Sequence, residues 1–546
     1  MSTLAKALSV AILMGAASQA AAVTGPAVTR ALAVIQQNPV PTRLSTSDTF
    51  TARAVTVDRN GTEHVRLDRT YKGLSVIGGD LVVHSKAGVF SRASLTQAKP
   101  VSLSTTPKIT STAAITAAGV QFGTRFDVLP TAHLVVYART ATPVLAYDVL
   151  YVGTRSDGTP TEMHYYVDAT TSAILAKEDA VHTGTLPGSG TGTPVATVGP
   201  GNSLMAGQVS LNTQWNPTRR IFEMKDPTRG NTRITDAGNG YRTAVSTLVV
   251  DADNKWGNGT MTDRVSTAVD AAYGFAKTWD FYKNNFGRLG IANDGVGASG
   301  AVHYSINYVN AFWSDSCFCM SFGDGNGTTV RPLVALDIMG HEMTHGVTSR
   351  TANLTYNSES GGLNEATSDI MGTMVEYYAN DAEQPPNYTI GEAIFVTPSP
   401  SNAIRWMFKP NLDHISPDCY PSATTPSNGI TLANFKAMDV HYSSGVANHF
   451  FYLLAEGAVV PAGFGAGTPA NLGPSDLVCN GNTGLAGIGR DAAQKIWYRA
   501  LTVYMTSSED YAKARVDTLL AAADLYGNGS TEYNAVSAAW AAVTMP

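Results

Sequence analysis

Charged side chains are sparse in this sequence, since Asp, Glu, Lys and Arg together make up 15% of its 546 residues. The formal net charge is −6, and no stretch is rich in lysine and arginine. Proteins that bind nucleic acids carry basic patches, so this composition argues against nucleic acid as a partner. By contrast, 44% of the residues are hydrophobic, which is enough for sizeable buried cores.

Long apolar runs are missing as well. No stretch has the 18 or more apolar residues that a membrane-spanning helix needs. The N-terminal sequence MSTLAKALSVAILMGAASQAAA places one lysine before an apolar run of about ten residues and ends in small residues. This pattern predicts a secretory signal peptide over residues 1–22, with a buried first helix as the alternative. We therefore expect a soluble, secreted, extracellular monomer without a stable membrane anchor.

Cysteine is rare, with four residues at positions 317, 319, 419 and 479. Their presence fits an oxidising compartment. Cys317 and Cys319 are two residues apart, so on a strand they would face the same way and pair poorly with each other. We expect each of them, if bridged, to reach Cys419 or Cys479, and the sequence leaves the connectivity open.

The chain is too long for one ordinary domain, and its patterns predict an α+β protein with several parts. Short alternating strands over 23–182 indicate one or two α+β modules, and the Gly/Thr/Pro-rich segment 183–201 indicates a linker that a protease can reach. Residues 202–335 are rich in strand patterns, and 336–546 are mainly helical. The predicted helices cover 265–285, 335–350, 361–379, 442–457, 488–505, 510–525 and 533–543.

One motif lies where the strand-rich part meets the helical part. In HEMTH, His341 and His345 are four residues apart, so on a helix both project from one face, about 6 Å apart along the axis. Glu365 follows after 19 further residues, past a Gly-rich turn and on a second helix. Two imidazoles and one carboxylate suit a tetrahedral zinc ion and leave its fourth position to water, as in catalytic zinc sites.

The neighbouring acidic residues complete this chemistry. Glu342 projects beside the histidine pair, where it can act as the base that takes a proton from the activated water and passes it to a leaving amine. Asp369 lies one turn after Glu365, where it can orient a ligand histidine. The motif therefore predicts peptide hydrolysis without a covalent intermediate, in a cleft between two lobes.

The sequence resembles the thermolysin family of secreted zinc metallopeptidases, in particular its elastase-like bacterial branch. The resemblance runs from KDPTRGN near residue 225 to the AAADLYG tail. It includes, in order, NAFW, GDGNG, HEMTH, LTYNSESGGLNEATSDIMG, DVHYSSGV and GIGRDAAQKIWYRAL. It implies a two-lobed catalytic domain with zinc at the cleft, bound by His341, His345 and Glu365, with Glu342 as the base.

The same resemblance assigns roles to residues that carry no local motif. Tyr356 and His441 would stabilise the oxyanion, and Asp439 would orient His441. Asn310 and Ala311 would hold the substrate backbone. The remaining implied substrate-binding residues are Arg405, which would grip a carbonyl, and an apolar pocket for the side chain after the scissile bond, formed by Val330, Leu333, Ile338 and Ile404.

Calcium and a propeptide are further implications of the resemblance. Asp337, Glu376 and Glu392 match family calcium ligands, and we expect one structural ion beside the catalytic zinc. Residues 23–182 resemble the fungalysin/thermolysin propeptide followed by a PepSY-like module. The chain is thus expected to be a self-processing zymogen whose partners are its own propeptide, as inhibitor and folding aid, and protein or peptide substrates.

Two other functions are consistent with parts of this pattern. A non-catalytic binding protein with the same fold would normally have lost Glu342, a zinc ligand or His441, and all are present. An exported aminopeptidase is disfavoured by the 19-residue spacing before Glu365 and by NAFW in place of a glutamate motif that anchors an amine.

Overall fold

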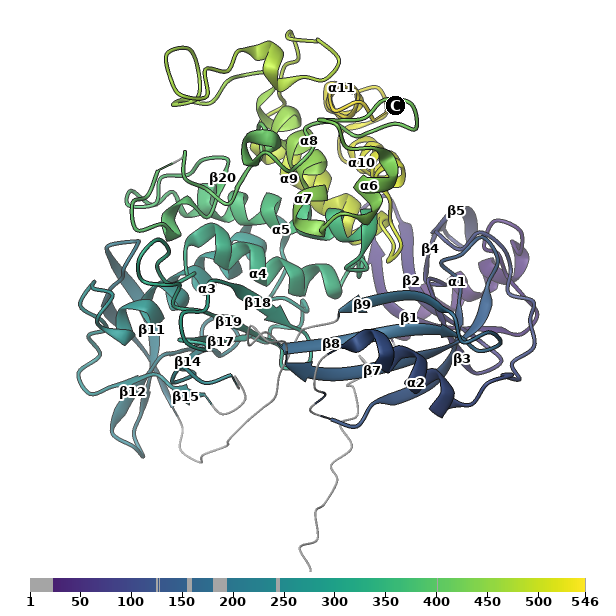
Figure 1. The fold of residues 1–546 in the computed structure, drawn as a ribbon, viewed down its shortest axis with the longest axis horizontal. Helices are drawn as coiled ribbons and strands as arrows, with labels where there is room; N and C mark the ends of the chain where they lie inside the picture. The colour runs from purple at the N-terminus through teal and green to yellow at the C-terminus, as the bar shows by residue number, and fades with distance from the viewer. Residues whose placement is uncertain are drawn as a thin grey trace, which may run out of the picture.

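A computed structural model describes residues 23–123, 126, 128–154, 160–179, 194–241, 246–399 and 401–545. The predicted signal peptide and the first part of the predicted linker lie outside these residues. Figure 1 shows the helical lobe above, with the strand-rich lobe and the N-terminal modules on either side below it.

The first N-terminal module packs one helix on an antiparallel sheet. Its elements are α1 (Pro26–Gln37), β1 (Asp48–Val57), β2 (Thr62–Tyr71), β3 (Leu74–Ile77), β4 (Leu81–Lys86) and β5 (Val89–Leu95). Ala31, Val34 and Ile35 of α1 are buried in one cluster with Val65 of β2 and Val83 of β4. Helical spacing in α1 and alternation in the strands thus place the apolar faces against each other.

A second module continues the same sheet. It contains α2 (Ser111–Phe122), β6 (Thr131–Tyr137), β7 (Val144–Thr154), β8 (Pro160–Asp168) and β9 (Ile174–Asp179). The strand order β5-β4-β2-β3-β6-β7-β8-β9, with β1 on β2, joins both modules in one nine-stranded sheet. The junction is the parallel pair β3–β6. Over the described residues, the N-terminal region therefore consists of two α+β modules, and its last strand ends at Asp179, before the predicted linker of 183–201.

The strand-rich lobe contains two sheets. The four-stranded sheet has the order β10-β11-β12-β16, and the six-stranded sheet has the order β13-β14-β17-β19-β18 with β15 on β14. Their bounds are β10 (Val195–Asn202), β11 (Gln208–Asn216), β12 (Ile221–Glu223), β13 (Lys225–Asp226), β14 (Thr232–Asp236), β15 (Thr247–Leu248), β16 (Val250–Asp251), β17 (Ser299–Val302), β18 (Ala311–Ser314) and β19 (Cys319–Phe322). The helix predicted at 265–285 is confirmed as α3 (Arg264–Phe286), which Asp263 caps at its start and Gly287 ends with φ 70°.

The predicted linker overlaps the first strand of this lobe. Residues 195–201 form most of β10, which pairs with β11 along its whole length. The glycines in this segment are needed for close packing rather than flexibility. A Cβ on Gly199 would lie 2.2 Å from the carbonyl oxygen of Asn254, and one on Gly201 would lie 2.7 Å from Val269 Cγ1. The linker prediction was wrong for this part, and the lobe begins before residue 202.

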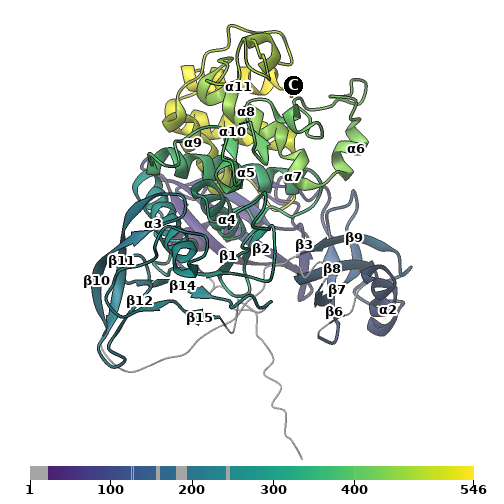
Figure 2. The same ribbon diagram turned by 60° about the vertical axis from the view of Figure 1, so that its left-hand side comes forward.

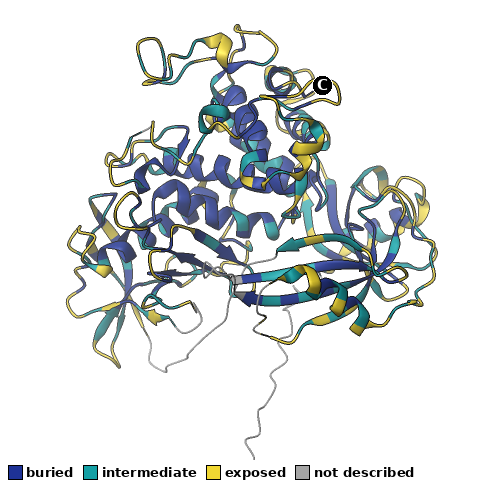
Figure 3. Ribbon diagram, in the orientation of Figure 1, coloured by how far each residue is buried: buried dark blue, intermediate teal, exposed yellow. Residues whose placement is uncertain are grey.

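The helical lobe confirms the predicted series of helices, but the Gly-rich turn predicted at 360–362 was wrong. These residues already belong to the helix that begins at Ser358, where Gly361 packs closely against Val440. The lobe contains α4 (Leu336–Ser349), α5 (Ser358–Ala379), α6 (Leu432–Ala437), α7 (Val440–Ser443), α8 (Gly445–Glu456), α9 (Arg490–Arg499), the π-helical turn η5 (Ala500–Tyr504), α10 (Tyr511–Tyr526) and α11 (Thr531–Ala542). Short elements between them are β20 (Thr389–Ile390), η2 (Glu392–Ile394), β21 (Arg405–Trp406), η3 (Pro410–Asp413) and η4 (Pro474–Leu477). Helices α4, α5 and α8 are largely buried (Figure 3). Of the helices in the described ranges, none combines the length and apolar character needed to cross a membrane.

Two glycines bring the central helices α4 and α5 together. A Cβ on Gly340 would lie 2.8 Å from Gly372 Cα, and one on Gly372 would lie 2.5 Å from the Asp337 carbonyl oxygen. Neither glycine has room for a side chain, so the two helix backbones are in direct contact. This contact sets the distance between the histidines on α4 and the glutamate on α5.

The disulfide prediction was wrong. Cys317 pairs with Cys319, and Cys419 pairs with Cys479 across a Cα–Cα distance of 6.1 Å. The first pair forms because the chain turns between β18 and β19 instead of continuing as a strand, and Phe318 has a φ of 53°. The turn places the two Cα atoms 5.1 Å apart, within the usual range for a disulfide.

Candidate metal centre and active-site cleft

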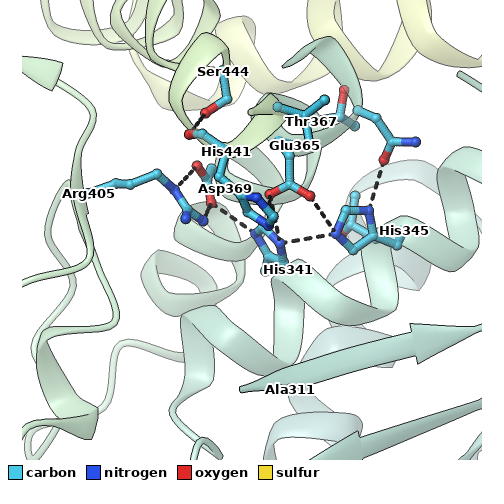
Figure 4. Close-up of polar contacts among 12 residues, drawn as sticks. Ala311, His341, His345, Glu365, Thr367, Asp369, Arg405, His441 and Ser444 are labelled. Carbon is cyan, nitrogen blue, oxygen red and sulfur yellow. Dashed lines mark hydrogen bonds and ion pairs between the residues drawn. The ribbon is translucent and has the colours of Figure 1, made fainter. Parts of the chain in front are cut away.

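Two helices bring the predicted zinc ligands together. His341 and His345 extend from α4, and Glu365 extends from α5 toward them (Figure 4). The two Nε2 atoms are 3.1 Å apart, and the Glu365 oxygens lie 3.3 and 3.4 Å from them. One ligand atom from each residue thus lies within 4.8 Å of the other two, as a single metal ion requires.

The hydrogen bonds around these residues leave the ligand atoms available. His341 Nδ1 lies 2.9 Å from Asp369 Oδ1, and His345 Nδ1 lies 2.8 Å from Asn364 Oδ1. A proton on each Nδ1 satisfies these contacts and leaves each Nε2 with a lone pair. Glu365 Oε2 is buried without a hydrogen-bond partner. An orphaned carboxylate oxygen beside two imidazole lone pairs fits a divalent zinc ion.

The charges of the site keep its carboxylates ionised. Burial raises the pKa of Glu365, but His441, His345 and His341 outweigh burial and hold this pKa well below its ordinary value. Burial likewise opposes ionisation of Asp369, whereas Arg405 and His341 lower its pKa. Both groups therefore carry negative charge over the neutral pH range, as a metal ligand and its supporting group should.

Asp369 holds several parts of the site at once. Besides its contact with His341, it accepts hydrogen bonds from Arg405 Nε at 2.8 Å and Nη2 at 2.6 Å, and from Asn448 Nδ2 at 2.8 Å. Asp369 is completely buried, so these partners replace the water that it lost on folding. The pairing fixes the guanidinium of Arg405 at the wall of the cleft.

Tyr356 and His441 meet on the other side of Glu365. The Tyr356 hydroxyl donates a short hydrogen bond to Glu365 Oε1, and it lies 3.3 Å from His441 Nε2. Asp439 accepts from the backbone N–H of His441 at 3.0 Å, and its Oδ1 lies 2.6 Å from His441 Nδ1. The hydrogen bond from His441 lowers the pKa of Asp439. The structure thus brings all three predicted residues together.

A cleft of about 980 Å³ opens above the ligands. It contains Glu342, Tyr356, Asp439 and His441 along with the zinc ligands. Every residue predicted to bind substrate also lines it, namely Asn310, Ala311, Val330, Leu333, Ile338, Ile404 and Arg405. Ala311 lies on β18, at the edge of its sheet and below the metal ligands (Figure 4).

The N-terminal modules reach the same cleft. Asp179, the last residue of β9, lines it, and the carbonyl oxygen of Lys177 accepts from Asn357 Nδ2 at 3.5 Å. Sequence reasoning missed these contacts because nothing in the strand pattern of 174–179 indicates what it faces. It also missed Asn364 and Asn448. Asn364 directly precedes Glu365 in NEATSD, which is a usable signal, whereas Asn448 belongs to no motif.

The three predicted calcium ligands form a buried acidic cluster behind α4. Asp337, Glu376 and Glu392 are 2%, 1% and 7% exposed. Burial and the charge of Glu392 raise the pKa of Asp337 to about 7, and burial together with Glu392 and Asp337 raises that of Glu376 well above its ordinary value. Asn387 bridges two of them, because its N–H donates to Glu376 Oε2 at 3.1 Å and its Nδ2 to Glu392 Oε1 at 2.7 Å.

Comparison with known families covers most of the chain. Residues 198–349 match the thermolysin metallopeptidase catalytic domain, and residues 352–545 match the thermolysin metallopeptidase alpha-helical domain. Residues 48–95, which include all five strands of the first N-terminal module, match the fungalysin/thermolysin propeptide motif. The N-terminal modules are accordingly called the propeptide below.

Two relatives that match along the sequence give the same assignment. A transglutaminase-activating metalloprotease of Streptomyces mobaraensis is 43% identical over 513 residues, which cover 92% of this chain and 62% of that protein. A thermolysin of Alicyclobacillus acidocaldarius subsp. acidocaldarius is 34% identical over 506 residues, 89% of this chain and 84% of that one. The solved precursor of protealysin, a metalloproteinase from Serratia proteamaculans, aligns with a TM-score of 0.44 and 25% identity over 58% of this chain and 87% of its own. The chain belongs to the thermolysin family of metallopeptidases.

Proposed function

We propose that the chain is a secreted zinc endopeptidase, made as a zymogen, that cuts peptide bonds on the amino side of apolar residues and processes itself. The observation that carries this proposal is the buried group of His341, His345 and Glu365, open on one side to a cleft that also holds Glu342. A structural zinc site would be closed by a fourth protein ligand, whereas this one faces the cleft.

The residues around the ligands suit hydrolysis by water. A zinc ion held by these three side chains would lower the pKa of a water in the cleft and polarise the scissile carbonyl. Glu342 lines the cleft beside the histidines, so its carboxylate accepts the proton of the attacking water and delivers it to the leaving nitrogen. No side chain needs to form a covalent bond to the substrate.

Tyr356 and His441 stabilise the carbonyl oxygen as it gains negative charge. Their hydroxyl and Nε2 groups lie 3.3 Å apart and face the same point near Glu365. Asp439 accepts a hydrogen bond from Nδ1–H of His441. Burial lowers the pKa of this ring, but Glu365 and Asp439 outweigh burial and raise it, so the protonated ring also presents an N–H at Nε2 to the cleft. Each such donor contributes a few kcal/mol to transition-state stabilisation, about 2.7–4 in well-studied cases.

Specificity arises from the apolar wall of the cleft. Val330, Leu333 and Ile338 are 7%, 5% and 6% exposed, and Ile404 is 38% exposed at the rim. Burying an apolar substrate side chain there contributes about 1.5–3 kcal/mol. A charged side chain would lose its water without gaining a partner, so the pocket selects Leu, Phe, Ile or Val after the scissile bond.

One calcium ion is proposed between Asp337, Glu376 and Glu392. Three buried carboxylates in mutual electrostatic contact are costly unless a cation or protons neutralise them. Carboxylate oxygens are among the ligands that calcium prefers. The cluster is adjacent to α4, so the ion would stabilise the helix that carries the zinc ligands.

The zymogen state is supported by the propeptide residues in the cleft. Asp179 lines the cleft, and Lys177 accepts a hydrogen bond from Asn357, another residue of its lining. A substrate that bound to the same wall would compete with this segment. This contact supports inhibition of the enzyme before cleavage and the proposal that the enzyme cuts its own chain.

The test uses Glu342→Gln, which removes the base and keeps a side chain of similar size. We expect this variant to bind one zinc ion, as measured by elemental analysis, and to lose activity on protein and peptide substrates by several orders of magnitude. In the wild-type enzyme, 1,10-phenanthroline should abolish proteolysis and low zinc should restore it. Full proteolysis by zinc-free protein, or by Glu342→Gln, would refute the proposal.

A further inference from the structure

A second contact between the propeptide and the enzyme lies away from the cleft. Strands β2 and β4 of the first propeptide module lie beside the C-terminal helices in Figure 1, and Figure 2 shows β2 below α5 and α10. Arg499, at the end of α9, binds Asp58 of the propeptide through Nη1 at 2.9 Å and Nη2 at 2.6 Å. Asp80 of the propeptide accepts from the N–H of Ser507 at 3.1 Å and from its hydroxyl at 2.6 Å.

Two histidines are buried in this contact. His64 on β2 and His84 on β4 are directly opposite in the register, and their Nδ1 atoms are 2.6 Å apart. His64 is 5% and His84 2% exposed. The enzyme covers them with the ring of Tyr504, whose centroid lies 6.0 Å from that of His64 and 5.2 Å from that of His84.

The hydrogen bonds around the pair are complete when both rings are neutral. Asp58 Oδ2 lies 2.9 Å from His64 Nε2, and Ser94 Oγ lies 3.0 Å from His84 Nε2. An ionised Asp58 requires the proton on His64 Nε2, so His64 Nδ1 accepts from the Nδ1–H of His84. His84 Nε2 then accepts from the Ser94 hydroxyl. Every ring nitrogen has a partner in this one arrangement.

A further proton has no favourable place in the bound state. On His64 Nδ1 it would face the Nδ1–H of His84 across 2.6 Å. On His84 Nε2 it would create a buried cation among guanidinium groups. The charged groups that face the two rings are Asp58, Arg66 and Arg92 from the propeptide and Arg499 and Asp524 from the enzyme. Arg499 Nη2 is only 3.3 Å from His64 Nε2.

We propose that this contact, formed by β2 and β4 against Arg499, Tyr504 and Ser507, is the surface that keeps the cut propeptide bound, and that protonation of His64 and His84 releases it. The proposal rests on the proposed function only in requiring that the chain is cut between its two parts. Burial lowers the pKa of His64 against the opposing effect of Asp58, and burial and Arg92 lower that of His84 strongly. Separation removes Tyr504 and Arg499 and exposes both rings.

The sign of the pH dependence follows from linkage. The bound state holds fewer protons than the separated propeptide, so the affinity is full above the free pKa of about 6.5 and falls as the pH drops below it. At pH 5, a histidine that stays neutral in the complex but is protonated in the free propeptide lowers the affinity about 30-fold, and the effects of two such histidines multiply. Asp58 is paired with Arg499, which contributes to lowering its pKa, so it does not titrate in this window.

The experiment uses the full-length Glu342→Gln chain with the recognition sequence of a site-specific protease inserted between Gly188 and Ser189. After cleavage, gel filtration of a dilution series between pH 8 and pH 5 measures the dissociation constant of the propeptide. We expect this constant to rise at least 30-fold from pH 8 to pH 5. Since the added protease makes the cut, failure here would leave the proposed peptidase function untouched, and failure of that function would leave this readout intact.

Matched variants separate the two histidines from other groups. The glutamine side chains of His84→Gln and His64→Gln cannot be charged, so each variant should lower the ratio of the dissociation constant at pH 5 to that at pH 8. His133 is an exposed histidine of the second module, and His133→Gln should behave like the parent. Arg499→Gln leaves the propeptide sequence intact, so it serves if the histidine variants fail to fold, and it should also reduce the ratio. A parent complex with equal affinity at pH 8 and pH 5, or His84→Gln and Arg499→Gln profiles identical to the parent, would overturn the proposal.

Discussion

Asn364 is a residue whose two hydrogen bonds fix one zinc ligand. Its Nδ2 donates to the carbonyl oxygen of Leu354 at 2.8 Å, which turns its Oδ1 toward His345 Nδ1. Asn364→Ala would leave His345 free to rotate, and losing such a partner typically weakens metal binding about 10–100-fold. We expect zinc affinity, measured by competition with a chelator, to fall in this range while the circular dichroism spectrum is unchanged.

The control for this variant is Asn434→Ala, which truncates an exposed asparagine at the start of α6. It should bind zinc as tightly as the parent. Equal zinc affinity in Asn364→Ala and the parent would show that helix α4 alone orients His345.

Cleavage preference is a second property decided by single residues. Leu333 and Ile338 are almost fully buried in the wall of the cleft, so a substrate side chain that enters there exchanges water for apolar contacts. In a peptide-library digest, cuts should fall before Leu, Phe, Ile or Val at least tenfold more often than before Lys, Arg or Asp. Leu333→Ala enlarges the pocket and should shift the preference toward larger side chains. A library dominated by cuts before charged residues would contradict the assignment of this pocket.

The sequence predicts residues well where chemistry and spacing are local. His341, Glu342 and His345 lie on one turn of helix, and their contact follows from helix geometry alone. Tyr356, His441 and Arg405 carry no such spacing, and only the family resemblance indicated where they lie. Asn448 donates to Asp369 from a different helix, α8, and Asp179 enters the cleft from the propeptide. Contacts between distant segments depend on the whole fold and leave no local trace in the sequence.

At the scale of elements, the acidic cluster behind α4 should make the lifetime of the enzyme depend on calcium. An ion bound between Asp337, Glu376 and Glu392 stabilises the native state by mass action, by about 2.7 kcal/mol at a hundredfold excess over its dissociation constant. The cluster lies outside the cleft, so a calcium-selective chelator should shorten the half-life at elevated temperature while the initial rate at 25 °C changes much less. Thermal inactivation assays with and without the chelator measure both quantities.

Glu376→Gln tests the same cluster by mutation, with the exposed Glu383→Gln as its control. The first variant should lose the response of its half-life to calcium, and the second should keep it. Equal inactivation of the parent enzyme with calcium and with chelator would rule out a structural ion at this place.

Helices were predicted closely from the sequence, whereas one strand and one turn were missed. Helices such as α3 and α10 have capping residues, Asp263 and Asp510, and buried faces of helical period, so their extents were predicted closely. Strand β10 was missed because its glycines resemble those of a flexible segment, yet they are required by contact with Asn254 and Val269. The turn that joins Cys317 to Cys319 was missed because a strand was assumed where the chain reverses.

At the scale of the whole molecule, the propeptide is bound at two places that differ in chemistry. Its last strand, β9, ends at the catalytic cleft, and its first module contacts the surface around Arg499. The two places lie on opposite ends of one continuous nine-stranded sheet. A cut near the cleft, as proposed above, would remove the covalent link but leave the second contact in place, so we expect inhibition and release to be separate events.

Maturation should therefore require the enzyme's own base. The structure ends β9 at Asp179 and starts β10 at Val195, and the segment between them follows directly from the residue that lines the cleft. In a host without other extracellular proteases, Glu342→Gln should accumulate as an uncut, zinc-loaded precursor, as seen by intact mass. A trace of active enzyme should then convert it to the mature form, with the new N-terminus between residues 180 and 194.

If the variant matures without help, either Glu342 is not the base or another protease makes the cut. Its activity on a peptide substrate distinguishes the two, because a chain without its base stays inactive after processing, whereas a chain with another base does not.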